Sequence, residues 1–280
     1  MGFRVHALRT GYWRPGTDYV KEVVEVVRDV VEDGDIVAVS EKAISTASGN
    51  IVDESRFSPS PLSRFLVRFW IRFVWGYLLS RLCRLRPATT RRLRDYPIRE
   101  GSVHKQVALR AVGFLQALRH YSEGGIDGSN LPYSYVSLPL KEAVKVADEI
   151  RRAIEEETGK EVTVMIVDGD TTYSLGCLHL APRKVPVRGL VHFGGFLTFV
   201  VGRALGVRGR ATPIALSGKP MTAEEALEAA DTAHRAMGHG AGRTVWDMAE
   251  RFGTSLTGVT WEMLESVEHR PVVVLRRLNL

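Results

Sequence analysis

The chain of 280 residues is poor in the residues that build disulfide-linked or zinc-clustered proteins. Its two cysteines, Cys83 and Cys177, form neither a disulfide framework nor a metal-type spacing, so we expect a reducing, cytoplasmic location. No stretch reaches the roughly 18 uncharged apolar residues that a membrane-spanning helix needs. The N-terminus has no apolar signal core, so we expect no targeting segment. These absences exclude the secreted disulfide-rich and the membrane-spanning classes.

Side-chain amides and the common catalytic motifs are also scarce. The chain has three asparagines and two glutamines, with 30 arginines against eight lysines, and this depletion of thermolabile amides favours a thermophilic protein. A mesophilic melting temperature would contradict that interpretation. The eight histidines form no His-x-x-x-His or His-Glu-x-x-His pattern, and no loop has Walker A or Rossmann spacing. Zinc-peptidase, P-loop and dinucleotide-binding classes are therefore not indicated.

The positive charge is concentrated in one segment. Residues 56–120 hold 14 Lys and Arg and two acids, Asp95 and Glu100, a net charge of +12. The remaining residues hold 24 basic and 30 acidic residues, a net charge of −6, which together give the +6 of the whole chain. The overall charge is therefore a poor guide to function.

The most informative motif is the loop 124–130, Gly-Gly-Ile-Asp-Gly-Ser-Asn. Glycine permits positive φ and close approach of the backbone to a ligand. On such a turn, Asp127 suits a hard cation, and free N–H groups suit phosphate oxygens. An ordinary turn, with Asp127 and Asn130 as turn formers, is the structural alternative.

A second acidic cluster, Val-Asp-Gly-Asp-Thr-Thr, covers residues 167–172. It follows the apolar, β-branched run 162–167, which predicts a buried strand. Carboxylates at the carboxyl end of a buried strand commonly face a ligand crevice. In a continuing strand, Asp168 and Asp170 would share a face. The two Asp clusters together could hold one or two Mg²⁺ or Mn²⁺ ions with substrate phosphates, or serve only as caps and turns.

The hydrophobic pattern predicts interleaved helices and strands without a regular βαβ repeat. Strands are expected at 3–8, 36–39, 133–138, 162–167, near 172–180, 196–201 and 271–275. Helices are expected from a Thr17 cap over 20–31, at 62–85, 103–121, 141–158 and 222–237, after Thr244, and at 260–267. The 222–237 helix begins with a capping box, Thr222 and Glu225.

The expected helix 62–85 combines a stripe of arginines at 64, 68 and 72 with many aromatic residues. It could lie in a membrane interface, bind nucleic acid through its arginines, or pack against a dimer partner. Because its apolar residues occur nearly all round, we favour burial against a partner over a solvated nucleic-acid face. A deletion of 62–86 that stayed soluble and dimeric would contradict that interpretation.

Two stretches together resemble a known family. Residues 7–54 contain Ala-Leu-Arg-Thr, Arg-Pro-Gly-Thr-Asp and Glu-Asp-Gly-Asp-Ile-Val-Ala-Val-Ser-Glu-Lys, and residues 124–171 run from Gly-Ile-Asp-x-Ser-Asn to Gly-Lys-x-Val-x-Val-x-Ile-x-Asp. These resemble the coenzyme F420-0:L-glutamate ligases (F420 γ-glutamyl ligases). The resemblance implies an α+β fold with mixed sheets and packed helices, in an intertwined homodimer. We expect a single domain over 1–280, with a basic helical insertion at about 56–100.

The resemblance also implies an activity and a set of site residues. It implies a GTP-dependent ligase, using Mg²⁺ or Mn²⁺, that joins L-glutamate to the carboxylate of coenzyme F420-0 or a related acidic small molecule through an acyl phosphate. Carried over by position, the metal ligands would be Asp127, Asp168, Asp170 and His239, with Asp127 and Asp168 central to catalysis. The nucleotide pocket would be formed by Arg9, Thr10, Gly11, Tyr12, Glu41, Lys42, Asn130, Gly238 and Gly240.

The sequence departs from the family pattern at several of these positions. Thr46 stands where the family has a nucleotide-contacting lysine, Gly169 where a threonine follows the second metal aspartate, and His239 where a glutamine or glutamate binds metal. The segments 56–100 and 243–269 are additions. The alternative function is therefore a non-catalytic relative that acts as a nucleotide-binding or membrane-interface scaffold. No nucleic-acid partner is expected.

Overall fold

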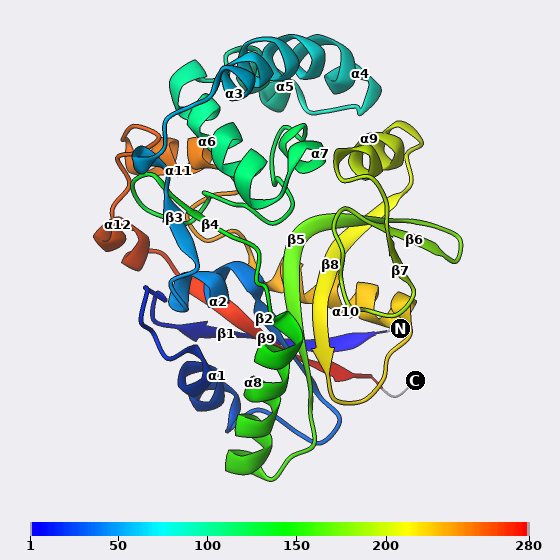
Figure 1. Ribbon diagram of the computed structural model, residues 1–280. Coiled ribbons are helices and arrows are strands. Elements are labelled where there is room, and N and C mark those ends of the chain that lie inside the picture. Colours follow the sequence, from blue (N-terminus) through cyan, green and yellow to red (C-terminus); the bar gives the residue numbers. More distant parts are fainter. Residues whose placement is uncertain (1, 279–280) are drawn as a thin grey trace.

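The computed structural model describes residues 2–278 and is built on one seven-stranded mixed sheet (Figure 1). The strand order is β1-β9-β2-β5-β6-β7, and β8 pairs with β5. β2 and β5 run parallel, as do β6 and β7, and the other neighbours are antiparallel. The strands are β1 (Phe3–Thr10), β2 (Ile36–Ser40), β5 (Thr163–Leu175), β6 (Leu178–Ala181), β7 (Leu190–His192), β8 (Arg208–Ser217) and β9 (His269–Arg277).

Alternating side chains of the central strands bury both faces of this sheet. On one face, Val37, Val164 and Val274 pack with α1 (Tyr19–Val27) and α8 (Ala143–Thr158). On the other, Ala38, Met165 and Val273 pack against the alanine-rich side of α10 (Ala223–Met237). Valine-rich strands covered on both sides read as continuous apolar runs, which is why the sequence predicted these strands correctly.

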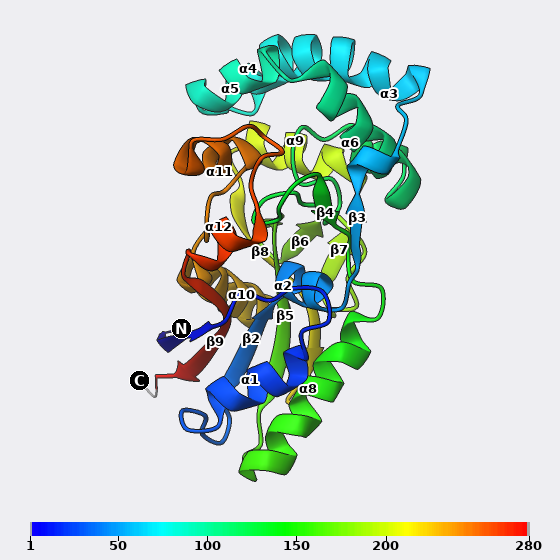
Figure 2. The ribbon, with the colours of Figure 1, turned by 90° about the vertical axis from the view of Figure 1, so that its left-hand side faces the viewer.

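A cap of helices covers a third apolar core at one end of the sheet (Figures 1 and 2). It contains α3 (Pro61–Phe65), the π-helical segment η2 (Leu66–Leu79), α4 (Ser80–Leu82), α5 (Pro87–Arg94), α6 (Ile98–Ala111), α7 (Phe114–Ala117) and α9 (Phe196–Ala204). The two-stranded sheet of β3 (Ile51–Asp53) and β4 (Tyr135–Ser137) connects the cap to the body. The remaining helices are α2 (Glu41–Ala47), η1 (Glu54–Arg56), α11 (Val245–Phe252) and α12 (Trp261–Glu265).

The predicted mixed α+β fold is confirmed, and most predicted elements are present. The capping box of Thr222 and Glu225 begins α10, and Thr244 caps α11. Gly159 ends α8 in the left-handed conformation. The first helix is capped by Asp18, whose side chain accepts the N–H of Lys21, while Thr17 accepts that of Arg14.

Two predicted elements were wrong, and one strand was missed. Residues 196–201 form the helix α9, not a strand, because a short apolar run fits either structure. The Tyr173 ring of β5 fills the space of a Cβ at Gly202, so α9 lies directly on the sheet. The predicted helix 103–121 is divided at Gly113, whose φ of +87° ends α6. The strand β8, for which no element was predicted, pairs along most of β5.

The helical segment 61–82 is buried on one side only. Leu66, Val67, Ile71 and Trp75 are inaccessible, whereas Phe65, Phe69 and Phe73 are at least half exposed. Within the single chain described, the segment is therefore not buried all round, and the predicted packing against a dimer partner stays a prediction. No helix among residues 2–278 is long and apolar enough to cross a membrane.

Candidate active site

The parallel pair β2 and β5 places the predicted acidic and basic residues at one edge of the sheet. Ser40, the last residue of β2, lies opposite Val167 in β5. Glu41 and Lys42 follow Ser40 as the first turn of α2, and Asp168 follows Val167. Because the carboxyl ends of parallel strands meet at the same edge, residues more than 120 positions apart in the chain become neighbours.

A cavity of about 670 Å³ lies at this edge, and we call it the main cavity. Most of the predicted site residues line it, namely Tyr12, Lys42, Asp127, Asn130, Asp168, Asp170, Gly238, His239 and Gly240. Lys42 is accompanied by four arginines on its wall, Arg210, Arg235, Arg243 and Arg270. A space of this size with several cationic side chains suits a phosphate-bearing small molecule.

Asp127 forms the centre of a tight turn on the wall of this cavity. Its Oδ1 accepts the backbone N–H of Ser129 at 2.7 Å, and its Oδ2 accepts the Lys42 ammonium at 2.8 Å. Lys42 also donates to the Ser129 hydroxyl at 2.8 Å. The side chain of Asp127 is 38% exposed. Asp127 therefore stabilises a turn, as the alternative of an ordinary turn predicted. It also presents a solvent-accessible carboxylate to the cavity.

Arg183 binds two of the carboxylates at the sheet edge. Its Nη2 donates to Asp168 Oδ2 at 3.0 Å and to the buried carboxylate of Glu41. The other Glu41 oxygen accepts the backbone N–H of Leu140. Burial raises the pKa of Glu41, and the Arg183 guanidinium partly offsets this effect. Glu41 therefore lies behind the cavity and holds Arg183, which in turn orients Asp168.

Asp170 is buried and keeps one carboxylate oxygen free. Its Oδ1 accepts the Arg119 guanidinium at 2.7 Å, and burial raises its pKa to about 7 although Arg119 counteracts that shift. Its Oδ2 has no hydrogen-bond partner among residues 2–278. The pairing of β5 with β8 skips Gly169 and Asp170, so the strand bulges where the two aspartates lie.

Asn130 fixes the glycine loop 238–242 beside the Asp127 turn. Its Nδ2 donates to the carbonyls of His239 and Gly242, and its Oδ1 accepts the N–H of Ala241 at 2.7 Å. Asn130 has a φ of +58°, and its Oδ1 lies 2.6 Å from where a Cβ of Gly240 would be. Its side-chain amide is therefore committed to the loop, and it would act on a nucleotide by positioning that loop.

Replacing Asn130 with alanine should loosen this loop. We expect a loss of stability of about 1–3 kcal/mol, because the loop groups lose their partners, together with weaker binding of the nucleotide that the family resemblance implies. Asn50→Ala is the matched control, since Asn50 Nδ2 also bonds two carbonyls, those of Leu138 and Pro139, outside this loop. Thermal unfolding with and without GTP measures both effects, and equal nucleotide shifts in the two variants would contradict the positioning role.

The side chains predicted to bind metal are mostly carboxylates, and they do not form one cluster. Within residues 2–278, no group of three or more His, Cys, Asp or Glu side chains is arranged to hold a metal ion. Mg²⁺ commonly uses one or two protein carboxylates and completes its shell with water and substrate phosphates. The accessible Asp127 carboxylate and the unpaired Asp170 oxygen fit that mode of binding. His239 lies beside His234, with ring centroids 6.2 Å apart, and burial lowers the pKa of both imidazoles.

Most of the predicted N-terminal residues lie behind the cavity wall and do not line the cavity. Thr10 and Gly11 contact the Nδ1 of His269, a residue that lines the cavity. Tyr12 reaches the cavity itself and donates its hydroxyl to the Asn130 carbonyl at 2.6 Å. Arg9 is exposed and lies outside the lining.

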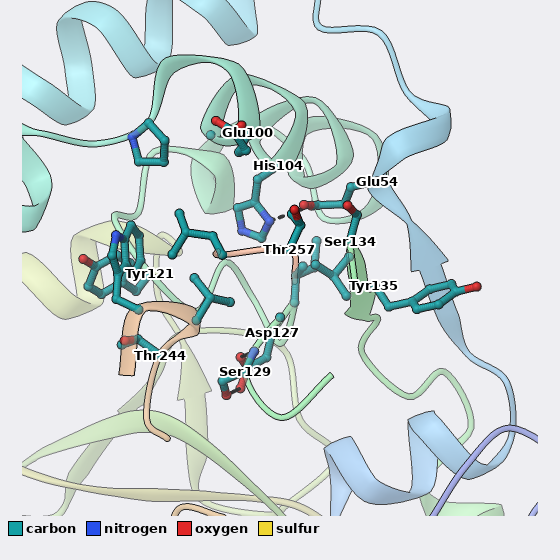
Figure 3. A pocket seen from close by; sticks show the side chains of 18 of the residues that line it. Glu54, Glu100, His104, Tyr121, Asp127, Ser129, Ser134, Tyr135, Thr244 and Thr257 are labelled. Atoms are coloured by element: carbon teal, nitrogen blue, oxygen red, sulfur yellow. Dashed lines mark hydrogen bonds and ion pairs between the residues drawn. The ribbon is translucent and has the colours of Figure 1, made fainter. Parts of the chain in front are cut away.

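A second cavity, of about 150 Å³, lies on the other side of the Asp127 turn (Figure 3). Both cavities are lined by Ser122, Ile126, Asp127, Ser129 and Arg243. Its remaining walls come largely from the segments 96–104 and 244–257. These segments are joined by Arg92, which pairs with Asp247 at 2.9 Å, and by the rings of Tyr96 and Trp246, 5.5 Å apart. The two added segments therefore meet over the predicted site.

A buried ionic network forms the back wall of the second cavity. Glu123 accepts Lys105 through one oxygen and His104 Nε2 through the other, and His104 Nδ1 contacts Glu54 at 2.7 Å. Lys105 and Glu123 are fully inaccessible. Burial alone would lower the pKa of His104, but the carboxylates of Glu54 and Glu123 outweigh it and raise that pKa to about 10.

This shift predicts a pH dependence of stability. The pKa of His104 is about 6.5 in the unfolded protein and is higher in the folded protein. Protonation of His104 therefore stabilises the folded protein, and this stabilisation is fully present below about pH 6.5. We expect this contribution to fall as the pH rises from about 6.5 toward about 10, by at most about 1.4 kcal/mol per pH unit. Urea unfolding across this range should show the decline in wild type and a flatter profile in His104→Gln. Identical slopes would contradict the assignment.

The residues that the sequence did not predict include two basic partners of predicted acids. Arg183, Arg119 and Arg243 belong to no motif, and the first two reach their carboxylates across 142 and 51 positions of the chain. Ser129 lies inside the predicted loop, but its contact with Lys42 could not be read from the loop alone. Nothing in their local sequence distinguishes these side chains from surface residues.

Sequence comparisons connect the chain to known proteins. A sequence model of the family described as F420-0:Gamma-glutamyl ligase matches residues 7–276. An uncharacterized protein of Methanocaldococcus jannaschii is 33% identical over 288 residues, which cover 98% of this chain and 96% of that protein. The coenzyme F420:L-glutamate ligase of Methanopyrus kandleri is 24% identical over 156 residues, which cover 55% of this chain and 54% of the ligase.

Proposed function

The chain belongs to the F420-0:gamma-glutamyl ligase family, and from this premise we propose that it is a GTP- and divalent-metal-dependent ligase. The family is one of ligases that form a carbon–nitrogen bond. The proposed substrates are L-glutamate and a carboxylate-bearing acceptor, coenzyme F420-0 or a related acidic small molecule. The observation that carries this proposal is the main cavity, in which the Asp127 turn, Lys42 and Asp168 meet at the edge of the sheet.

The proposed reaction has two steps. The acceptor carboxylate oxygen attacks the γ-phosphorus of GTP, GDP leaves, and an acyl phosphate forms. The amine of glutamate then attacks the acyl carbon, loses a proton, and expels inorganic phosphate to leave an amide. Both steps develop negative charge on phosphate oxygens, so catalysis requires positioning and charge neutralisation.

The residues of the cavity suit these requirements. Lys42, held between Asp127 and Ser129, would place its ammonium against phosphate oxygens, and Arg243 would add a second cation. Asp127, Asp168 and Asp170 would hold Mg²⁺ or Mn²⁺, whose bound form neutralises and aligns the phosphates. Because the Asp127 side chain is 38% exposed, against 19% for Asp168 and 1% for Asp170, we infer that Asp127 is the principal protein ligand.

We propose that one of the two amide-forming substrates approaches the Asp127 turn through the second cavity. We expect Thr257→Trp, which would fill this cavity from its exposed rim, to raise the KM of glutamate or of the acceptor by at least about tenfold. The KM of GTP should change little. Ser255→Trp, in the same loop but outside the cavity lining, is the control. If both variants behaved alike, the cavity would have no role in substrate entry.

The proposal is tested first by nucleotide binding and then by formation of the amide product. Thermal shifts should be measured with GTP, GDP and ATP, each with and without Mg²⁺ or Mn²⁺. Amide formation from coenzyme F420-0 and L-glutamate should then be followed together with phosphate release. A metal-dependent GTP shift with amide formation supports the ligase, and no shift with any nucleotide would overturn it. Nucleotide binding without amide formation from any acidic acceptor would indicate a non-catalytic scaffold.

A further inference from the structure

The helical segment 61–82 carries an exposed row of aromatic side chains, which we call the aromatic row. Phe65, Phe69, Phe73 and Tyr77 are 56%, 50%, 58% and 45% exposed. Their spacing of four residues keeps them on one side of the helix, and neighbouring ring centroids are 5.4, 6.3 and 6.1 Å apart with nearly parallel planes. The exposed Leu62, Leu78 and Leu82 extend the same apolar surface.

The opposite side of this segment fixes the row in its outward position. Ile71 and Trp75 are fully buried, and the indole N–H groups of Trp70 and Trp75 both donate to the carbonyl of Leu118 at 2.7 Å. Turning the helix to hide the row would expose Trp75 and break these bonds. The cap forms the outermost layer at its end of the molecule, so the body of the chain leaves the row accessible (Figures 1 and 2).

The charged residues of the segment that carries the row are all positive. Residues 56–94 contain no Asp or Glu. Arg64 and Arg68 immediately precede Phe65 and Phe69 and are exposed, as are Arg81, Arg84 and Arg86 at the far end. Of the arginines at positions 61–94, Arg92 is the only one that forms an ion pair with a carboxylate in the described part of the chain. Its partners are Asp247 and Glu250.

We propose that the aromatic row docks on an anionic lipid membrane, with the helical segment lying in the plane of the surface. The phenylalanine and leucine side chains would enter the boundary between headgroups and acyl chains. The unpaired arginines beside them would meet lipid phosphates. This proposal is independent of the proposed ligase activity, because none of these side chains lines either cavity.

Charge favours this occupant over a twofold contact of the patch with its own copy. A twofold contact would place the same patch against itself, so arginines without carboxylate partners would face one another. Such like-charge contacts are unfavourable, whereas an anionic surface neutralises all of them at once. The row also leaves more apolar area exposed than single surface residues do, and such patches mark interaction sites.

The test is sedimentation of the full chain with vesicles. Vesicles of phosphatidylcholine alone should be compared with vesicles that also contain phosphatidylglycerol. We expect binding to the anionic vesicles, little binding to the neutral ones, and weakening by salt. Phe69→Ser/Phe73→Ser should lower the affinity at least about tenfold, since two large apolar side chains no longer leave water. Phe193→Ser, an exposed aromatic residue outside the row, should bind as wild type does.

Two further measurements distinguish membrane binding from misfolding of the variants and from contact with a second copy. Arg64→Gln/Arg68→Gln should reduce the salt sensitivity while the aromatic row stays intact, and unchanged melting temperatures would show that the variants fold. Absence of sedimentation with either kind of vesicle would overturn the proposal. It would also be overturned if light scattering showed that Phe69→Ser/Phe73→Ser lowers the oligomeric state, because a second copy would then cover the row.

Discussion

Replacing Asp127 with asparagine is expected to abolish the metal-dependent GTP response that the proposed ligase function predicts. The amide is isosteric with the carboxylate, and its oxygen can still accept the Ser129 N–H that closes the turn. What is lost is the negative charge, which would bind the metal and which now balances the Lys42 ammonium at 2.8 Å. Because the carboxylate is 38% exposed, its removal should change stability little.

The expected magnitude is large. A ligand present at 100 times its Kd stabilises the folded state by about 2.7 kcal/mol, a shift of several degrees in Tm, and this shift should disappear. The rate of amide formation should fall by more than about 100-fold, since even residues behind a metal ligand typically account for 10–100-fold. Ser129→Ala removes a contact of both Lys42 and Asp127 but no charge, so its effect should be smaller.

The control for Asp127→Asn is the same substitution at Asp148, which pairs with Arg151 and Arg152 on α8, outside both cavities. Asp148→Asn should keep the GTP response. If Asp127→Asn also kept a full metal-dependent shift, Asp127 would be a turn former alone, and the metal assignment would move to Asp168 and Asp170.

The sequence predicted the acidic residues of this site and Lys42, but it missed the arginines that bind the carboxylates. Asp127 and Asp168 stand in local patterns, a glycine turn and the end of a buried strand, and the structure brings them to one cavity. Arg183 and Arg119 have no local pattern, because their position depends on how distant elements pack. The chain has 30 arginines, so residue type alone could not single out these two.

The same limit explains the errors in the fold. Five of the six residues 196–201 are apolar, so neither a two-residue nor a 3.6-residue period could be read from this run. In the segment 61–82, apolar side chains occur all round, and only the packed structure shows that Trp75 is buried while Phe73 is exposed. Local periodicity predicts an element, whereas the side on which it packs is decided by the rest of the chain.

Replacing Glu123 with glutamine should produce the largest loss of stability outside the apolar core. This carboxylate is 1% exposed and binds both the inaccessible Lys105 and His104. Glutamine cannot neutralise them, so a buried charge loses its partner, which typically costs about 3–5 kcal/mol. For a chain of this size, we expect Tm to fall by about 10 °C. Glu100→Gln, an exposed carboxylate of the same helical cap, should have almost no effect.

A double variant distinguishes the loss of charge neutralisation at Lys105 from the loss of packing at Glu123. Lys105→Met/Glu123→Leu removes both buried charges and keeps similar volumes, so it should recover most of the stability lost in Glu123→Gln. His104 would keep Glu54 as its partner at 2.7 Å. Denaturant unfolding of the variants measures the difference. A loss below about 1 kcal/mol in Glu123→Gln would mean that water reaches Lys105 and stabilises its charge. If the double variant were as unstable as the single one, the network would instead be required for the packing of the helical cap, and with it for the shape of the second cavity.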